Sequence, residues 1–250
     1  MPEIIAHRGE SHLAPENTLA AVNLAWENAA DAVECDIHLS KDGEIVVIHD
    51  DNTMRTAGRD APVSEQTLAE LRALDAGKWK GERWSGEKIP TLAEILATVP
   101  DGKSLFVEIK CGPEVIPKIG ETLRESSKSP RQVVPIGFSL STMEAAKRAF
   151  PQLDVYWLCG FSKCEKTGAW APTVGELVDN AGRAGVDGLN LQFHEAIDSA
   201  FVRGIKAANL KLYVWTIDSP SDARRMAAIS VDGVSTNRAG WLRGRIADRG

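Results

Sequence analysis

Short apolar runs alternate with amphipathic stretches along almost the whole chain. This alternation is typical of repeated βα units, in which each buried strand is followed by a helix that covers it. Nine apolar runs are predicted strands: Ile4–Ala6, Ala32–Ile37, Ile45–Ile48, Leu105–Ile109, Val133–Phe138, Val155–Leu158, Gly188–Leu191, Leu212–Thr216 and Gly233–Thr236.

Capping residues mark the helix starts between these runs. Ser219-Pro220 places a good cap directly before a proline at the first helical position. Three pairs have the spacing of a capping box, in which two side chains satisfy backbone N–H groups at the start of a helix: Thr91/Glu94, Ser141/Glu144 and Thr173/Glu176.

Nine strands are one too many for an eight-stranded barrel. The turn Lys41-Asp42-Gly43-Glu44 identifies the extra one, because Asp-Gly between two strand-like runs is a strong hairpin signal. Antiparallel strands cannot be neighbours in an all-parallel barrel, so we interpret Leu39–His49 as a hairpin that folds back toward the second strand and returns His49 to its end. The other eight runs predict the α/β class and a (β/α)8 TIM barrel.

Residues 51–90 lack the alternation of strand and helix patterns found in the rest of the chain. They contain four glycines, and their only clear periodic element is a weak helical pattern over Ser64–Leu74. A segment of this length without regular structure is usually functional or a lid, so we predict an insertion over the barrel mouth. Trp79 and Trp84 could line a substrate pocket there, although anchoring the insertion to the barrel is the favoured role.

The composition fits one soluble domain over residues 1–250, with 43% hydrophobic and 26% charged residues. A net charge of −6 argues against a nucleic-acid partner, because binding to a phosphate backbone requires clustered Lys and Arg. No apolar run approaches the roughly 18 residues of a membrane-spanning helix, so no stable membrane association is expected. The oligomeric state stays open.

The N-terminus and the cysteines favour a cytoplasmic protein. An active-site candidate is reached as early as His7, so a signal peptide is not expected. The four cysteines form no CxxC motif, and the separation of Cys159 and Cys164 is too weak a signal for a zinc site. Free thiols in a reducing compartment are the prediction.

Three acidic residues stand in two predicted strands. Glu34 and Asp36 are two residues apart, so both carboxylates point to one face, and Glu108 with Lys110 repeats this arrangement on the next barrel strand. Inward-facing carboxylates are costly unless a cation compensates them, and oxygen ligands suit Mg²⁺ or Ca²⁺. The alternative is a buried salt-bridge network with Lys110 and Arg8.

His7-Arg8-Gly9 ends the first strand, at the end of a barrel where active sites are built. Arg8 is suited to forked hydrogen bonds with phosphate oxygens. Two histidines at one mouth, His7 and His49, can serve as general acid and general base on opposite sides of a phosphorus centre. The other three histidines are more simply read as satisfied polar residues: His12, His38 and His194.

These residues, in this order, resemble the glycerophosphodiester phosphodiesterase family. The resemblance runs from the first strand to the last, and the joint order of its segments is specific although each one is weak. The matching segments are His7-Arg8-Gly9, Ala14-Pro15-Glu16-Asn17-Thr18, Glu34-Cys35-Asp36, Lys41-Asp42-Gly43, His49-Asp50, Ile89-Pro90-Thr91-Leu92, Glu108-Ile109-Lys110, Val214-Trp215-Thr216 and Val231-Asp232-Gly233-Val234.

The resemblance implies a barrel with a short insertion after the second strand and hydrolysis of glycerophosphodiesters to glycerol 3-phosphate and an alcohol. It also implies a role for each matching residue. His7 and His49 would be the acid/base pair, Arg8 and Lys110 would hold the phosphate, and Trp215 would line the glycerol side. The metal ligands would be Glu34, Asp36 and Glu108, and the supports of the first-strand loop Glu16 and Asn17.

The sequence departs from the family pattern near its end. Thr236-Asn237-Arg238-Ala239 stands where Thr-Asp-x-Pro is common, so a role given to that aspartate is in doubt here. Two other functions were weighed against the leading one. A lysophospholipase D-type activity would need an apolar or membrane-facing surface, and no basic amphipathic helix supplies one. A barrel that only binds a phosphorylated metabolite would be favoured if a histidine or acid were missing, and none is.

Overall fold

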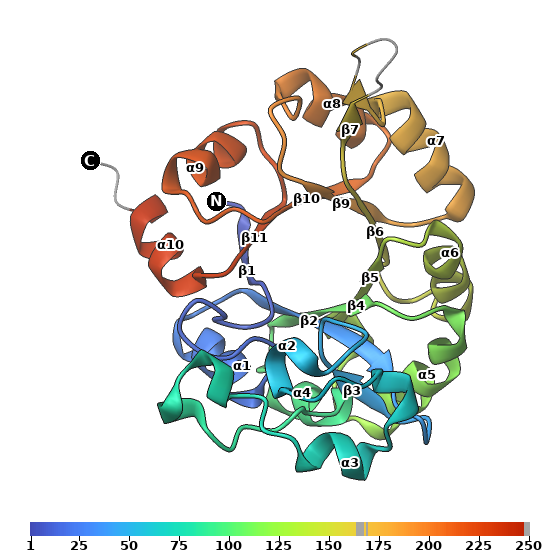
Figure 1. Cartoon of the computed structure of the whole chain (residues 1–250). Helices are drawn as coiled ribbons and strands as arrows, with labels where there is room; N and C mark the ends of the chain where they lie inside the picture. Colours follow the sequence, from blue (N-terminus) through green and yellow to red (C-terminus); the bar gives the residue numbers. More distant parts are fainter. Residues whose placement is uncertain (164–167, 169, 248–250) are drawn as a thin grey trace.

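Eight parallel strands form a ring, with helices around the outside (Figure 1). The computed structural model describes residues 1–163, 168 and 170–247. The ring strands are β1 (Glu3–Ala6), β2 (Ala32–Leu39), β4 (Ser104–Ile109), β5 (Val133–Gly137), β6 (Tyr156–Cys159), β9 (Gly188–Gln192), β10 (Lys211–Trp215) and β11 (Gly233–Thr236).

Hydrogen bonding between the first and second strands closes the ring. Neighbours run in the order β1-β11-β10-β9-β6-β5-β4-β2, and Ile5 of β1 then pairs with Ala32 of β2. All these pairings are parallel. The predicted (β/α)8 barrel is therefore confirmed.

The ninth predicted strand pairs outside the ring. β3 (Ile45–Val47) runs antiparallel to the far end of β2, with Ile37 opposite Val47 and Leu39 opposite Ile45. The turn between them needs Gly43, whose φ of 81° is a left-handed conformation that side chains with a Cβ rarely adopt. The hairpin prediction is confirmed, and it explains why β2 extends two residues beyond the predicted Ile37.

Helices follow the ring strands and cover their outer faces. They are α1 (Leu19–Glu27), α4 (Leu92–Thr98), α5 (Ile116–Glu125), α6 (Leu140–Ala149), α7 (Val174–Ala184), α8 (Ser199–Ala207), α9 (Pro220–Ala228) and α10 (Ala239–Ala247). No helix among the described residues has the length and apolarity to cross a membrane.

Two of the three predicted capping boxes are confirmed. Thr91 and Thr173 each accept a hydrogen bond from the third helical N–H, and the glutamate at that position bonds back. The Ser141 cap is wrong. The side chain of Ser139 accepts from Thr142 N instead, so α6 already begins at Leu140.

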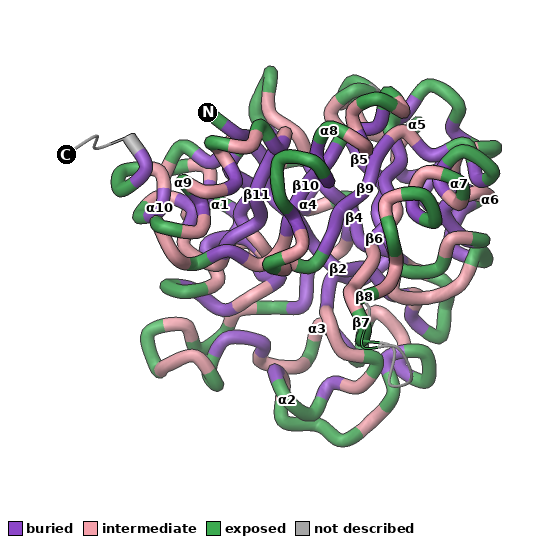
Figure 2. Tube along the Cα trace, turned by 90° about the horizontal axis from the view of Figure 1, so that it is seen from above, coloured by how far each residue is buried: buried purple, intermediate pink, exposed green. Residues whose placement is uncertain are grey.

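The core has two parts, inside and outside the ring. The outer part packs the strands against the helices and includes Val33, Cys35 and Val107. The inner part is an apolar plug in which Tyr156 stacks on Tyr213 with ring centroids 5.1 Å apart. Figure 2 shows that the strands consist mostly of buried residues. The members of the inner part are Ile5, Ala32, Phe106, Val134, Ile136, Tyr156, Leu158 and Tyr213.

Residues 51–90 form short helices around a small apolar cluster, which also includes Val46 and Ile48 of the hairpin. The elements are α2 (Met54–Ala57), α3 (Leu68–Ala73) and three 3₁₀ helices, η1 (Val63–Glu65), η2 (Lys78–Lys80) and η3 (Glu82–Trp84). The helix predicted over Ser64–Leu74 is present but begins later, at Leu68, because Gln66 is extended and the capping box of Thr67 with Glu70 starts α3 there.

Two cations tie this segment to the loop that follows β1. Lys80 Nζ donates to the Ser11 carbonyl at 2.6 Å, and Arg83 donates to the Leu13 carbonyl at 2.9 Å. Figure 2 shows α2 on the same end of the barrel as the small hairpin of β7 (Ser162–Lys163) and β8 (Trp170–Ala171). Cys164 lies outside the described residues.

Candidate active site

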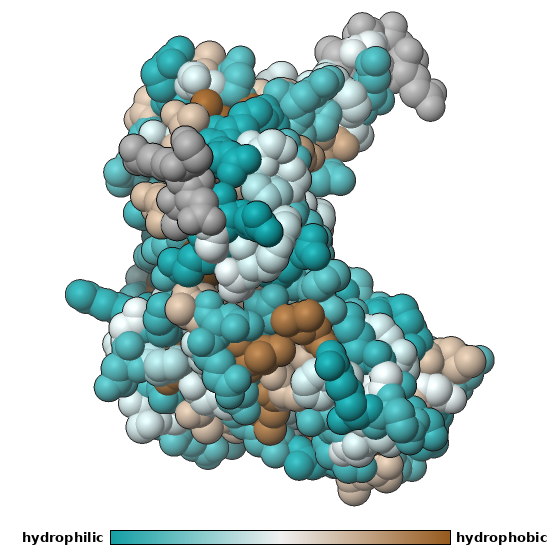
Figure 3. Space-filling view, turned by 90° about the vertical axis from the view of Figure 1, so that its left-hand side faces the viewer, coloured by the Kyte–Doolittle hydropathy of each residue, from teal (hydrophilic) through white to brown (hydrophobic). Residues whose placement is uncertain are grey.

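A cavity of about 150 Å³ lies at the carboxyl ends of the ring strands. Figure 3, a side view, shows the molecule hollowed on its right-hand edge, where this end of the barrel lies. The cavity is lined by His7, Arg8, Glu34, His49, Glu108, Lys110, Ile136, Phe138, Leu158, Asn190, Trp215 and Ser235. Seven of the eight predicted site residues are in this lining, and the eighth, Asp36, lies fully buried behind it.

Strand pairing brings the three acidic residues together. β2 and β4 are parallel neighbours, and Asp36 stands opposite Glu108 in their register. Glu34 lies one pleat earlier on the same face of β2. One carboxylate oxygen from each of the three lies within 4.8 Å of the other two, and the side chains are only 3%, 0% and 8% exposed in sequence order.

Two of these oxygens have no hydrogen-bond donor among the described residues. They are Glu34 Oε1 and Asp36 Oδ1, and both are buried. Burial, followed by the charges of Asp36 and Glu108, raises the pKa of Glu34 well above its ordinary value. Burial and then the Asp36 charge raise the pKa of Glu108 to about 7. Buried acceptors without donors, in a cluster of like charges, fit a bound divalent cation.

The two cations predicted beside the cluster are present. Arg8 Nε lies 3.3 Å from Asp36 Oδ2, and Lys110 Nζ donates to Glu108 Oε1 at 2.8 Å. Burial would lower the pKa of Lys110, but the charges of Glu108 and Asp36 raise it by more, so the ammonium form is favoured. The salt-bridge alternative therefore accounts for part of the cluster, since Lys110 Nζ also lies 3.7 Å from Asp36 Oδ1, but neither this oxygen nor Glu34 Oε1 has a hydrogen-bond donor among the described residues.

The loop after β1 adopts strained backbone to place Arg8. Arg8 and Asn17 both have positive φ, at 56° and 58°. The Arg8 N–H donates to Glu34 Oε2 at 2.9 Å, and the Asn17 amide donates to Asp36 Oδ2 at 2.8 Å. Gly9 follows at φ 82°, where a Cβ would lie 2.6 Å from the Ala21 carbonyl carbon. A glycine is therefore needed at this turn for the chain to approach α1.

The two histidines reach the cavity from different elements. His7, directly after β1, bonds through Nδ1 to Asn237 Oδ1 at 2.8 Å, and its Nε2 lies 4.0 Å from Glu34 Oε2. Burial, then the nearby Arg8 charge, lowers the pKa of His7, which favours the neutral ring. His49, after β3, bonds through Nδ1 to Asp50 Oδ1 at 2.7 Å.

Lys110 connects His49 to the acidic cluster. Its Nζ lies 3.1 Å from His49 Nε2, so the ammonium donates to a ring nitrogen that carries no hydrogen. Asp50 requires the hydrogen of the neutral ring on the other nitrogen, Nδ1. The ring of His49 is thus held at both nitrogens, with Nε2 toward the cavity.

Arg55 is a residue of the site that sequence reasoning missed. It donates to both oxygens of Asp50 and to both oxygens of Glu16, at distances between 2.6 and 3.1 Å. Glu16 in turn accepts from Arg8 at 2.9 Å. Arg55 lies in the irregular 51–90 segment, and no periodicity or spacing there could have pointed to its partners.

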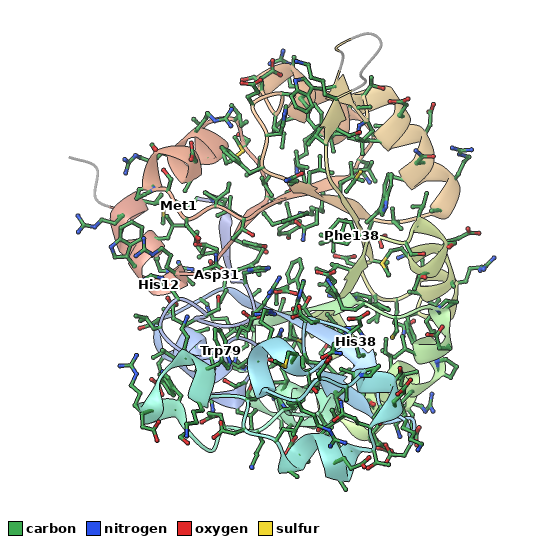
Figure 4. All side chains as sticks on the ribbon, in the orientation of Figure 1. Met1, His12, Asp31, His38, Trp79 and Phe138 are labelled. Atoms are coloured by element: carbon green, nitrogen blue, oxygen red, sulfur yellow. The ribbon has the colours of Figure 1, made fainter. Side chains whose placement is uncertain are left out.

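The opposite wall of the cavity is apolar. Trp215 packs edge-to-face on Phe138 with ring centroids 5.7 Å apart, and its Nε1 donates to the Asn190 carbonyl at 3.1 Å. Phe138 is 50% exposed at the rim, and Figure 4 places it across the barrel from His12. Sequence analysis found Trp215 and missed Phe138, because a large apolar residue at a strand end reads as core.

The remaining histidines do not line the cavity. His38 bonds to the His49 carbonyl at 3.1 Å, and His12 lies 3.1 Å from an Arg238 nitrogen. His194 stacks on Phe161 with ring centroids 4.8 Å apart. Each of the three has a partner in the fold, as the simpler interpretation predicted.

Known proteins resemble the chain over nearly its full length. The glycerophosphoryl diester phosphodiesterase family profile matches residues 7–240. A glycerophosphodiester phosphodiesterase of Caldanaerobacter subterraneus subsp. tengcongensis is 35% identical over 94% of this chain and 93% of its own. A putative glycerophosphodiester phosphodiesterase of Bacillus subtilis is 33% identical over 94% of this chain and 93% of its own.

A solved structure agrees with both the sequence and the fold. It is a phosphodiesterase of Oleispira antarctica in complex with the product sn-glycerol-3-phosphate, and it superposes with a TM-score of 0.86. The two chains are 30% identical, and the match covers 98% of this chain and 97% of that one. With this agreement in profile, sequence and barrel architecture, the chain belongs to the glycerophosphoryl diester phosphodiesterase family.

Proposed function

We propose that this protein hydrolyses glycerophosphodiesters to glycerol 3-phosphate and an alcohol, with a divalent cation and a pair of histidines. One observation carries the proposal. Three buried carboxylates converge beside His7 and His49 in a single cavity, and two of their oxygens have no hydrogen-bond donor among the described residues. A phosphodiester is anionic, so its hydrolysis needs charge neutralisation, an activated hydroxyl and a protonated leaving oxygen.

The cation would be held by Glu34, Asp36 and Glu108. Their oxygen ligands suit Mg²⁺ or Ca²⁺. When bound, such an ion supplies Lewis-acid polarisation and neutralises charge on the phosphate. Two neighbouring groups would orient these ligands. The Asn17 amide donates to the Asp36 carboxylate, and the Arg8 backbone N–H donates to the Glu34 carboxylate.

Arg8 and Lys110 would hold the phosphate oxygens. Both line the cavity, and both carry a charge that the acidic cluster stabilises. Fixed cations in a site that excludes bulk water stabilise developing negative charge more than they would in solution. Each keeps at least one N–H for the substrate, since a guanidinium has five donors and an ammonium three.

His7 and His49 would transfer the protons. One ring accepts the proton of the attacking hydroxyl, which belongs to water or to the substrate's own neighbouring hydroxyl. The second route forms a cyclic phosphate, which water would then open to glycerol 3-phosphate. The other ring donates a proton to the alcohol oxygen as its bond to phosphorus breaks. Nδ1 of each ring is engaged by Asn237 or Asp50, which leaves Nε2 as the atom that would transfer the proton, and His49 Nε2 would exchange its contact with Lys110 for one with the substrate.

Trp215 would line the glycerol side of the pocket, as the family resemblance implies. Phe138 adds to the same apolar wall, and the 51–90 segment at the mouth would help to select the alcohol group. A cavity that is lined by both charged and aromatic side chains and opens at the barrel mouth suits a small-molecule substrate. The cytoplasmic location predicted from the sequence stays a prediction.

An assay of glycerophosphodiesters with added metals tests the function. The protein is stripped with EDTA, and release of glycerol 3-phosphate is then measured with no metal, with Mg²⁺ and with Ca²⁺. Hydrolysis that vanishes on chelation and returns with one of the ions is the expected result. Full turnover after chelation would remove the cation from the proposal, and no turnover of any glycerophosphodiester with either ion would remove the substrate class.

A further inference from the structure

Asp218 and Asn237 lie behind His7. In the hydrogen bonds between them, the donor and the acceptor can be identified. Asp218 follows β10 and Asn237 follows β11, and the adjacent pairing of these strands places them together. The Asp218 carboxylate accepts from Thr236 Oγ1 at 2.8 Å, from Asn237 N at 2.8 Å and from Asn237 Nδ2 at 2.7 Å. Although partial burial raises the pKa of Asp218, these bonds lower it by more, so the group is an ionised acceptor.

An ionised carboxylate can only accept hydrogen bonds, and this fixes the side-chain amide of Asn237. The NH₂ group must face Asp218, and the amide oxygen must therefore face His7. The turned amide would bring two acceptor oxygens together at 2.7 Å. Ser11 Oγ lies 3.1 Å from the same Asn237 Oδ1, but its single hydroxyl hydrogen is directed to the His7 carbonyl at 2.8 Å, so Asp218 alone determines the orientation of the amide.

Asn237 Oδ1 lies 2.8 Å from His7 Nδ1 and can only accept from it. We infer that Asp218, acting through Asn237, holds His7 as the Nδ1–H tautomer and so keeps the Nε2 lone pair available in the cavity. Asp218 and Asn237 are then positioning residues for the proton transfer at His7, an inference that rests on the proposed function. Asp218 and Asn237 determine which ring nitrogen of neutral His7 carries the hydrogen. They are not proposed to set the pH at which the ring takes up a second proton.

This arrangement also accounts for the departure of this sequence from the family pattern at position 237. The carboxylate that is common there is replaced by an amide, and a carboxylate stands one hydrogen bond further away, at Asp218. An aspartate at 237 would accept from His7 Nδ1 in the same way that the asparagine oxygen does. Either residue type at position 237 therefore offers His7 an acceptor oxygen.

The test is the ¹⁵N spectrum of the imidazoles in the metal-free full-length protein, at a pH where His7 is neutral. The His7 signals are assigned by their loss in His7→Gln. We expect a protonated Nδ1 and an unprotonated Nε2. In Asn237→Leu this preference should be lost, and kcat of the metal-loaded protein should fall by about 10²–10⁴-fold. Circular dichroism verifies that the variant is folded.

Two further variants separate the tautomer from general structural damage. Asp218→Asn lets the 237 amide turn, so a mixture of His7 tautomers and a lowered kcat are expected. The double variant Asp218→Asn with Asn237→Asp restores a one-directional chain, because the new carboxylate faces both His7 Nδ1 and an amide at 218. It should recover the Nδ1–H signal and most of the lost turnover. Asp222→Asn, four residues away, is the matched control for the change of charge.

The outcomes distinguish this inference from the proposed function. A hydrogen on Nε2 of His7 in the unaltered protein overturns the inference, and so does an Asn237→Leu variant that keeps both the tautomer and kcat. An unaltered protein with the Nδ1–H tautomer but no activity on any glycerophosphodiester would instead contradict the proposed function.

Discussion

Arg55 donates to Glu16 at 2.8 and 3.1 Å, which joins the 51–90 segment to the loop that carries His7 and Arg8. The same guanidinium bonds to Asp50, and the Arg55 hydrogen bonds hold the pKa of that carboxyl well below its ordinary value. Asp50 is thereby kept as the charged partner of His49. One side chain thus supports the proposed phosphate-binding residue Arg8, through Glu16, and the proposed acid/base residue His49, through Asp50.

The first prediction follows from this double contact. Arg55→Ala should lower kcat by about 10–10²-fold, because both Arg8 and His49 lose their supports. Arg55→Lys should retain part of the activity, since an ammonium carries the charge but cannot form both bidentate contacts. Steady-state kinetics measure this, with exposed Arg59→Ala as the control. An Arg55→Ala variant that is folded and as active as Arg59→Ala would contradict the role.

The second prediction concerns the two histidines. His7→Ala and His49→Ala should each lower kcat by at least about 10²-fold while the fold is kept, because each ring transfers one of the two protons. His12→Ala is the matched control, since His12 contacts Arg238 and does not line the cavity. Near-normal turnover in both of the first two variants would remove the acid/base assignment.

The third prediction is a gain in stability at the expense of activity. Glu34→Gln removes one of three like charges from a fully buried cluster. In the metal-free protein it should raise the free energy of unfolding by about 1–2 kcal/mol, which is roughly 2–8 °C in Tm. It should also lose the rise in Tm that Mg²⁺ or Ca²⁺ produces. Thermal unfolding with and without metal measures both effects, with exposed Glu27→Gln as the control, and a lowered metal-free Tm would contradict the charge argument.

The fourth prediction links metal binding to pH through Glu108. Its pKa in the folded protein is about 7, against an ordinary value of 4.5. The folded state therefore binds more protons than the unfolded state between these values. The stability that this group contributes is fully present below pH 4.5 and is lost as the pH rises through 7. A cation needs the ionised carboxylate, so the increase in Tm on adding Mg²⁺ or Ca²⁺ should be larger at pH 8 than at pH 6. An equal or larger increase at pH 6 would contradict it.

The fifth prediction tests the apolar wall. Phe138→Ala and Trp215→Ala should each raise KM for glycerophosphodiesters by about 5–30-fold, with a smaller change in kcat, because they remove aromatic contact area and leave the acid/base groups in place. Trp241→Ala, which changes an exposed tryptophan of α10, is the control. Unchanged KM values would place the substrate on the other side of the cavity.

The sequence predicted more of the polar site than of its supports. The sequence indicated Glu34, Asp36 and Glu108 because they are charged residues inside otherwise apolar strands. A purely structural role seldom explains such a pattern. The hairpin was found because Asp42-Gly43 demands a particular turn. Arg55 and Phe138 were missed because neither breaks a local sequence pattern. The Ser141 cap was wrong because the side chain of Ser139, two residues earlier, accepts the hydrogen bond from the Thr142 N–H.

Taken alone, the sequence determined the barrel, the hairpin and the set of chemically active side chains, since periodicity and turn chemistry are local properties of the chain. Only the tertiary structure decided how those side chains are oriented. The acceptor for His7 comes from a residue 230 positions away, and the donor to Glu16 comes from one 39 positions away. Strand order and loop packing determine these hydrogen-bond partners, because they bring together groups that have no regular spacing along the chain.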